Sequence, residues 1–240
     1  MIDFEQLTRN IKGDVMTDSL HQMIYATDAS AYREMPLAVV YPRDASDVKA
    51  CIGFARENGI TLIPRAAGTS LAGQVVGNGV VVDVSRYMNR VLEINEEEHW
   101  VRVEPGVVLD ELNMRVKSLG LFFGPETSTS NRCCLGGMVG NNSCGSHSLV
   151  YGSTRDHLLE AKVILSNGEE VVLKGLEKKE VLDKMTCDSL EGKIYKCAVE
   201  MLEKNGEEIV QHFPDPALRR RNSGYAIDQL LYSNYFDATR

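Results

Sequence analysis

The clearest helical pattern near the start of the chain lies between residues 44 and 59. Apolar side chains recur there three and four positions apart. They are Val48, Cys51, Ile52 and Ala55. This spacing places them on one face of a helix. Asp44 or Ser46 can cap its first turn, and Gly59 can end it in a left-handed conformation. The pattern predicts a helix of roughly three turns, followed by a buried strand over residues 60–63.

Several short strands are predicted further along the chain. A strand is predicted over residues 80–84, after a Gly-Asn-Gly turn signal. Residues 90–94 and 100–103 read as a hairpin with an acidic tip between them. A second hairpin is predicted around Asn167-Gly168, a pair that favours two-residue turns.

Three more helical segments are predicted between and after these strands. Apolar residues at 109, 112, 116 and 119 mark one amphipathic helix, which Gly120 ends. The others lie near residues 180–184 and 190–204, whereas the first 35 residues are weakly patterned and predict an arm with a short helix. Short strands mixed with helices indicate an α+β fold.

The amino-acid composition and net charge of the chain argue against some classes of binding partner. The 240 residues are 43% hydrophobic and 25% charged, which is typical of a soluble globular protein. The net charge of −8 argues against nucleic acid or an anionic membrane as the main partner. The apolar runs are too short for a transmembrane segment, and the first residues do not resemble a secretory signal. An acidic chain that binds phosphate is expected to use backbone N–H groups.

The six cysteines do not form a recognisable metal or redox motif. They are Cys51, Cys133, Cys134, Cys144, Cys187 and Cys197. None lies in a C-x-x-C pair, and no Cys/His spacing matches a zinc or iron–sulfur site. With no export signal, reduced thiols in the cytoplasm are the plain interpretation.

A loop rich in small residues follows the 60–63 strand, and we call residues 64–73 the first loop. Small side chains let a ligand approach the backbone, and successive N–H groups in a tight turn can bind an anion. Thr69 and Ser70 add hydroxyl donors. The loop matches neither the P-loop nor the G-x-G-x-x-G pattern. An ordinary connection between strands is the alternative.

Residues 125–146, the second loop, form the most unusual stretch of the chain. Glycine, serine, threonine and asparagine dominate it. A loop of this length inside a compact domain is normally functional or disordered. Leu135, Met138 and Val139 are spaced for one short helical turn, which argues for order. We interpret the flanking glycines as positions where backbone meets a flat ligand; a glycine-rich structural loop is the alternative.

The two loops, in this order and about sixty residues apart, resemble the PCMH-type FAD-binding domain of the vanillyl-alcohol-oxidase/p-cresol-methylhydroxylase flavoprotein family. The most similar branch is that of glycolate oxidase, D-lactate dehydrogenase and D-2-hydroxyglutarate dehydrogenase. Other matching pieces occur in the family's order. They are Val40-Tyr41-Pro42-Arg43, Val103-Glu104-Pro105-Gly106, Tyr151-Gly152 and Arg221-Asn222-Ser223-Gly224-Tyr225.

The resemblance implies a two-lobed fold with a small N-terminal α/β lobe, a larger mixed-sheet lobe and FAD between them. We expect an arm at 1–35 and the FAD-binding domain at 36–240, with lobes at about 36–100 and 101–240. The implied FAD-binding residues come from both loops and the segment after them. They are Pro64, Arg65, Ala66, Ala67, Gly68, Thr69, Ser70, Gly73, Pro125, Gly136, Gly137, Asn142, Ser143, Gly145, Gly152, Val163 and Ile164.

Three positions depart from the family pattern. The family more often has glycine where this chain has Ala66 and Ala67, so these two alanines should adopt ordinary negative φ angles. Cys144 replaces a common glycine. Some relatives attach FAD covalently through histidine or cysteine, but here non-covalent FAD is the favoured interpretation.

The resemblance implies oxidation of a D-2-hydroxy acid, of the lactate, glycolate or 2-hydroxyglutarate type, to the 2-oxo acid. Electrons would pass from the flavin to an acceptor or electron-transfer module, which could place the protein at a membrane periphery. We expect the chain to be truncated, without the substrate-cap domain that carries the catalytic residues. A divalent metal and an iron–sulfur cluster would also belong to that missing part. The chain alone is therefore expected to be inactive and to bind FAD poorly.

Two alternatives remain open at this stage. One is a flavoenzyme of another class on the same fold, similar to UDP-N-acetylenolpyruvoylglucosamine reductase. The other is a nucleotide-binding module without catalytic activity. The two loops alone do not separate these alternatives from an oxidase, because all three would cradle a nucleotide.

Overall fold

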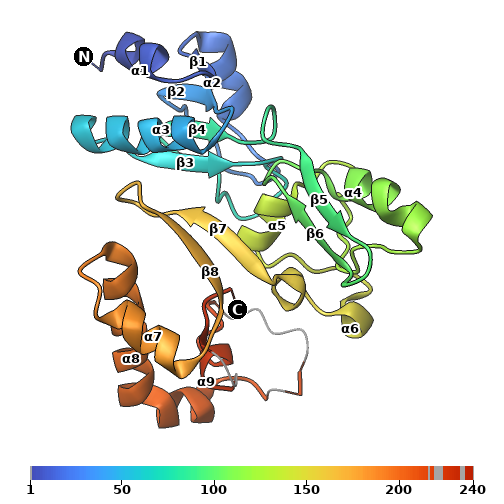
Figure 1. Cartoon of the computed structure of the whole chain (residues 1–240). Coiled ribbons are helices and arrows are strands. Elements are labelled where there is room, and N and C mark those ends of the chain that lie inside the picture. The colour runs from blue at the N-terminus through green and yellow to red at the C-terminus, as the bar shows by residue number, and fades with distance from the viewer. Residues whose placement is uncertain (1, 216, 219–223, 233–235, 240) are drawn as a thin grey trace. The chain divides into compact units, whose positions relative to one another are not determined.

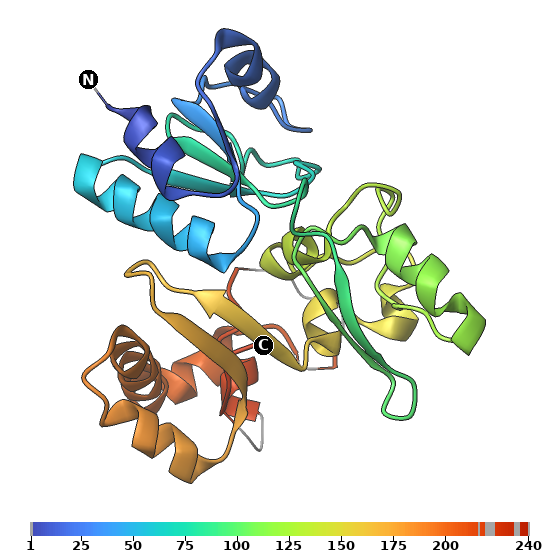
Figure 2. The ribbon, with the colours of Figure 1, turned by 45° about the horizontal axis from the view of Figure 1, so that its top comes forward.

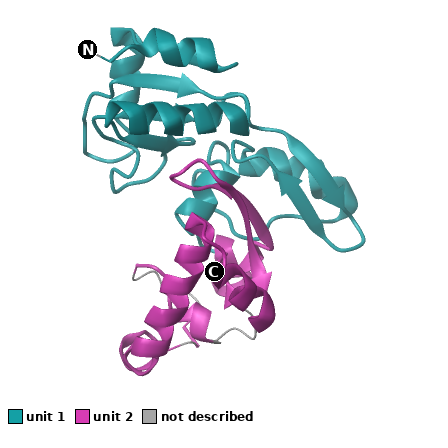
Figure 3. Cartoon of the chain, turned by 60° about the vertical axis from the view of Figure 1, so that its left-hand side comes forward, with its two compact units in different colours: residues 1–146 teal, residues 147–240 magenta. Residues whose placement is uncertain are grey.

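A computed structural model describes residues 2–215, 217–218, 224–232 and 236–239 (Figure 1). Its contacts group the chain into two compact units, residues 1–146 and 147–240 (Figure 3). This division differs from the lobes that we expected at 36–100 and 101–240, because the second loop packs with the first unit. Part of the 221–225 motif, residues 221–223, lies outside the described residues.

The first unit is built on a four-stranded sheet with the order β1-β2-β4-β3. Its strands are β1 (Asp14–Met16), β2 (Ala38–Tyr41), β3 (Leu62–Arg65) and β4 (Val80–Asp83). Strands β2, β4 and β3 are parallel, and β1 is antiparallel to β2. All residues of β2 and β4 are buried, as expected for parallel strands that are covered on both faces.

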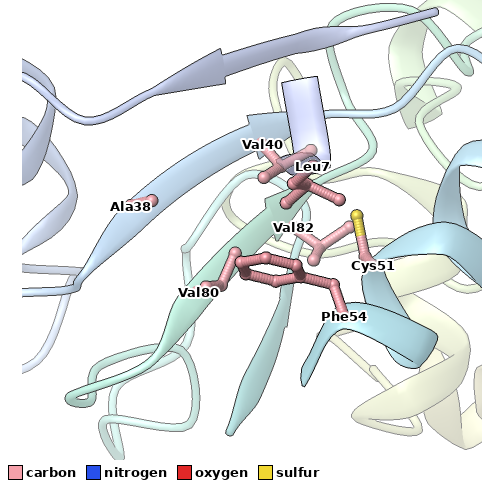
Figure 4. Packing of buried hydrophobic residues seen from close by; sticks show 7 residues of the cluster. All are labelled: Leu7, Ala38, Val40, Cys51, Phe54, Val80 and Val82. Carbon is pink, nitrogen blue, oxygen red and sulfur yellow. The ribbon is translucent and has the colours of Figure 1, made fainter. Parts of the chain in front are cut away.

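Helices α1 (Phe4–Asn10) and α3 (Ala45–Asn58) lie together on one face of this sheet (Figure 2). Figure 4 shows their shared core, in which Leu7, Cys51 and Phe54 of the helices meet side chains of β2 and β4. The strand residues are Ala38, Val40, Val80 and Val82. As predicted, Asp44 caps α3 and Gly59 ends it with φ 63°.

The opposite face of the sheet is covered partly by helix α2 (Ser19–Tyr25). Tyr25 packs there with Tyr41, Ile63 and Val81. We predicted that residues 1–35 form an arm. In the structure they instead supply a strand and two helices to the first unit. The sequence concealed this role because β1 has only three residues, all half-buried, and so shows no alternation.

The rest of the first unit packs around a second core. It contains the predicted hairpin of β5 (Val91–Asn95) and β6 (Trp100–Val103), then α4 (Leu109–Val116), the 3₁₀ turn η1 (Lys117–Leu119) and α5 (Leu135–Gly140). Leu109, Leu112 and Val116 of α4 meet Leu135 and Met138 of α5 in this core. The short helical turn predicted in the second loop is therefore confirmed and is anchored by its apolar side.

The second unit combines a three-stranded antiparallel sheet with helices. Its order is β7-β8-β9, with β7 (Glu160–Ile164), β8 (Glu170–Leu176) and β9 (Phe236–Asp237). The β7–β8 hairpin turns at the predicted Asn167-Gly168. The helical elements are α6 (Ser148–Tyr151), η2 (Thr154–His157), α7 (Lys178–Met185), α8 (Leu190–His212) and α9 (Gln229–Tyr232). None of the described helices has the length and apolar character needed to cross a membrane.

A buried carboxylate ties the N-terminal segment to the start of α3. Asp47 is 1% exposed and accepts hydrogen bonds from the backbone N–H groups of Lys12, Gly13 and Arg43, each at 2.9 Å. Lys12 and Gly13 directly precede β1, and Arg43 precedes α3, so one side chain of α3 fixes two backbone segments.

We predict that Asp47→Ala lowers the free energy of unfolding by about 3 kcal/mol, because it removes the buried acceptor of three part-buried N–H donors. Asp3→Ala is the control, because Asp3 is an exposed helix cap that, within the described residues, accepts only from the Glu5 N–H at 3.0 Å. Its loss should cost about 1 kcal/mol. Urea unfolding followed by circular dichroism measures both. Equal losses in the two variants would contradict the role assigned to Asp47.

Candidate functional site

The first loop begins where the parallel strand β3 ends. Arg65 closes β3 opposite Asp83 of β4, and the chain then turns through residues 66–70, which are half-buried. Gly68 has φ 65° and Gly73 has φ 75°, both left-handed. Among the described residues only His99 and Asn142 are non-glycine residues with positive φ. Ala66 and Ala67 therefore follow the expectation of negative φ, and the loop carries the two alanines without strain.

Three successive backbone donors in this loop face no protein partner. Within the described residues, the N–H groups of Gly68, Thr69 and Ser70 donate to no protein acceptor. The Gly68 carbonyl, in contrast, has a protein partner and accepts a hydrogen bond from the Ala29 N–H at 3.0 Å. Adjacent free amides on a half-exposed turn are the geometry of an anion site.

The second loop reaches the same part of the unit through α5. The Leu135 N–H donates to the Val107 carbonyl at 2.9 Å, and the Gly136 N–H donates to the Pro105 carbonyl at 2.8 Å. A Cβ on Gly136 would lie 2.5 Å from the Pro105 Cβ. Only glycine permits this approach, which sets the position of α5.

The structure brings the two loops into contact. A Cβ on Gly137 would lie 3.3 Å from the Ala66 Cβ. The Gln74 Nε2 donates to the Asn141 Oδ1 at 3.1 Å, and the Ser70 hydroxyl is bonded to the Gln74 Oε1. Gly137 and Asn141 are exposed, so the junction opens to solvent. The two loops therefore share one surface of the first unit.

The end of the second loop folds back on its beginning. Asn142 has φ 42°, which asparagine tolerates, and the Ser143 N–H donates to the Met138 carbonyl at 2.9 Å. A Cβ on Gly145 would lie 1.9 Å from the Glu126 carbonyl oxygen, next to the buried Pro125. The glycine thus closes the loop by direct contact between backbones.

Three predicted site residues belong to the second unit. Gly152 has φ 78° and ends α6 beside the Asp156 carboxylate, while Val163 and Ile164 are half-buried in β7. Their part in the cofactor site stays a prediction.

Two cysteines of the second loop, Cys133 and Cys134, have a structural role. Cys133 and Cys134 are buried, and the Cys134 thiol is hydrogen-bonded to the Ala67 backbone. Burial, aided by the Asp83 carboxylate, raises the pKa of Cys134 to about 11, so this thiol is neutral near pH 7. It packs beneath the first loop and does not act as a nucleophile. Groups of three or more metal-ligating side chains are absent from the described residues.

These residues fit a dinucleotide that contains a diphosphate. Free amides at Gly68, Thr69 and Ser70 suit phosphate oxygens, and the Thr69 hydroxyl is a further donor. Gly137 is exposed and has no side chain, so the backbone there can approach a flat ring.

Sequence reasoning missed the residues that join the loops. Gln74 and Asn141 carry no spacing signal, because they are 67 residues apart in the sequence. Ala29, which holds the Gly68 carbonyl of the first loop, was missed for the same reason. Gln74 follows Gly73 directly, yet a lone amide side chain after a glycine indicates no particular contact.

Comparison with known proteins agrees with this geometry. The profile of the family described as FAD binding domain matches residues 36–174. D-2-hydroxyglutarate dehydrogenase from Pseudomonas putida is 40% identical over 233 residues, covering 95% of this chain and 23% of the relative. Glycolate oxidase subunit GlcD from Bacillus subtilis is 34% identical over 162 residues, covering 67% of this chain and 34% of the relative. The chain thus spans about a quarter of the length of the dehydrogenases that it matches.

Solved structures show the same fold at lower identity. 6-Hydroxy-D-nicotine oxidase from Arthrobacter nicotinovorans aligns with a TM-score of 0.62 at 23% identity, covering 71% of this chain and 38% of that chain. An alkyldihydroxyacetonephosphate synthase aligns with a TM-score of 0.62 at 21% identity, covering 71% of this chain and 37% of that chain. The predicted α+β fold and flavoprotein resemblance are confirmed: this chain belongs to the FAD binding domain family.

Proposed function

We propose that this chain is the FAD-binding portion of a flavin-dependent oxidoreductase that oxidises a D-2-hydroxy acid to the 2-oxo acid. The observation that carries the proposal is the row of free amides at Gly68, Thr69 and Ser70, beside a second glycine-rich loop. Relatives named D-2-hydroxyglutarate dehydrogenase and glycolate oxidase subunit support the substrate class. Both names describe enzymes that act on 2-hydroxy acids.

In this proposal the first loop holds the diphosphate of FAD non-covalently. Its backbone N–H groups donate to the phosphate oxygens, so that the acidic chain needs no cluster of lysines. The second loop lies against the flavin ring, where Gly137 and Gly145 bring backbone to its surface. Bound FAD supplies the redox chemistry, taking up the two electrons that leave the alcohol carbon.

The remaining parts of the reaction belong to the proposal as well. Because the chain covers only 23% of the dehydrogenase relatives, we assign substrate binding and proton removal to residues outside it. A divalent metal, an iron–sulfur cluster and the electron acceptor would also lie there. We place the protein in the cytoplasm, with contact to a membrane only through that acceptor.

The two alternatives make different predictions. A reductase similar to UDP-N-acetylenolpyruvoylglucosamine reductase would bind FAD equally but would be reduced by a nicotinamide cofactor. A nucleotide-binding module without catalysis would show no preference for FAD over ADP. The identity of 34–40% to enzymes of 2-hydroxy acids favours the proposed oxidation over both.

We predict that Gly68→Ala weakens FAD binding about tenfold, a loss of about 1.4 kcal/mol. Gly68 has φ 65°, and a Cβ there would lie 2.6 Å from the Arg65 Nη2, so either the turn or the Arg65 guanidinium must shift. Gly59→Ala is the matched control, since it has φ 63° and no atom within 4 Å of an added Cβ.

Both substitutions introduce a similar backbone strain, of about 1 kcal/mol, but only Gly68 lies in the first loop. FAD titration followed by amide chemical shifts measures weak as well as tight binding. If Gly68→Ala and Gly59→Ala bound FAD equally well, the first loop would not be the diphosphate site.

The substrate class is tested on the natural protein that contains this chain. Anaerobic addition of D-2-hydroxyglutarate, D-lactate or glycolate should bleach the visible absorbance of its bound flavin, whereas L-2-hydroxyglutarate should not. Bleaching by NADPH alone would instead identify the reductase alternative. Absence of any visible flavin band in that protein would contradict FAD binding itself.

A further inference from the structure

Asp83 is a buried carboxylate at the end of the central strand β4, next to the first loop. It is 5% exposed. Its Oδ1 accepts from the Ser85 N–H at 2.8 Å and the Ser85 hydroxyl at 2.6 Å, and its Oδ2 accepts from the Tyr25 hydroxyl at 2.6 Å. One of the two carboxylate oxygens is therefore dedicated to Tyr25, which lies 58 residues away in sequence.

Tyr25 in turn supports Arg65. The Arg65 guanidinium carbon lies 4.9 Å from the centre of the Tyr25 ring, within the range of cation–π attraction. Burial, together with Asp83 and Tyr41, raises the pKa of Tyr25, so its hydroxyl stays protonated and donates to Asp83 near pH 7. The hydrogen bond fixes the phenol, and the fixed ring supports one face of the guanidinium.

The side chain of Arg65 then contacts the turn of the first loop. Its Nη1 donates to the Thr27 carbonyl at 2.9 Å, and a Cβ on Gly68 would lie 2.6 Å from its Nη2. Within the described part of the chain, Arg65 forms no ion pair with a carboxylate. Its positive charge therefore lies beside Gly68, at the start of the free amides of residues 68–70, and no carboxylate of the described residues neutralises it.

The segment that follows Tyr25, residues 26–32, contacts the same loop. The Ala29 N–H donates to the Gly68 carbonyl at 3.0 Å, and a Cβ on Gly73 would lie 2.7 Å from the Tyr32 ring. The end of α2 and the segment after it thus contact the first loop at Arg65, Gly68 and Gly73.

From these contacts we propose that Tyr25 and Asp83 are positioning residues of the cofactor site. Asp83 holds the Tyr25 hydroxyl, the Tyr25 ring holds Arg65, and Arg65 sets the position and charge of the turn that binds the diphosphate. The inference deepens the proposed FAD binding and rests on it. Neither residue touches the ligand, and neither belongs to a motif of the two loops.

Tyr25→Phe tests this inference, with Tyr87→Phe as the matched control. The Tyr87 hydroxyl also donates to a carboxylate, Asp14, at 2.6 Å, and Arg43 also lies over its ring, at 4.1 Å. The two substitutions therefore delete the same kind of bond in the same unit, but only one of them is connected to the first loop. Two readouts are compared: FAD affinity and hydrogen exchange of the Ala29 amide, which reports its bond to Gly68.

We expect Tyr25→Phe to raise the FAD dissociation constant about tenfold and to accelerate Ala29 exchange more than exchange in the buried strands β2 and β4. Tyr87→Phe should leave both quantities close to those of the unchanged protein. Exchange that accelerates equally at Ala29 and in the strands would show general destabilisation and would overturn the positioning role. Unchanged Ala29 exchange and FAD affinity in Tyr25→Phe would overturn it too.

The failure of the proposed function gives a different result. The unchanged chain could show no FAD binding even at high FAD concentration, while Tyr25→Phe still accelerates exchange of the Ala29 amide. That result would contradict the proposed FAD binding but would support the role of Tyr25 in holding the turn. The exchange measurement needs no ligand, so the inference is decided in either case.

Discussion

The approach of two backbone segments that almost lack side chains is the contact on which this site depends. Gly137 lies against Ala66 so closely that a Cβ would come within 3.3 Å, and Gln74 reaches Asn141 beside them. Neither segment could come so near with larger residues at these positions. The small side chains at this junction allow the contact, while Gly136 and Gly145 permit other close approaches, to Pro105 and to Glu126.

Two buried carboxylates hold neighbouring chain segments in place through hydrogen bonds. Asp47 accepts from three backbone N–H groups and ties β1 to the start of α3, and Asp83 ties the end of α2 to the end of β4. Both lie in the first unit. A loop with free amides at 68–70 has few bonds of its own, so its order depends on such neighbours.

Sequence reasoning located the elements whose signals are local. The helix α3 with its two caps, both hairpins and the turn of α5 follow from periodicity and turn residues, and the two loops follow from their small side chains. Strand β1 and the role of the first 35 residues were missed because three half-buried residues carry no pattern. Tyr25, Ala29 and Asn141 were missed for another reason. Their contacts join residues far apart in sequence, and no local rule connects a tyrosine at the end of a helix to an aspartate at the end of a strand.

The central claim is that the two loops bind one ligand together. Site-resolved titration of the chain with FAD, read from the amide chemical shifts, tests it most directly. The account predicts that amides of residues 67–70 and of residues 136–143 shift in parallel, with one common dissociation constant. Shifts confined to one of the two loops, or two loops that titrate with different constants, would contradict a shared site.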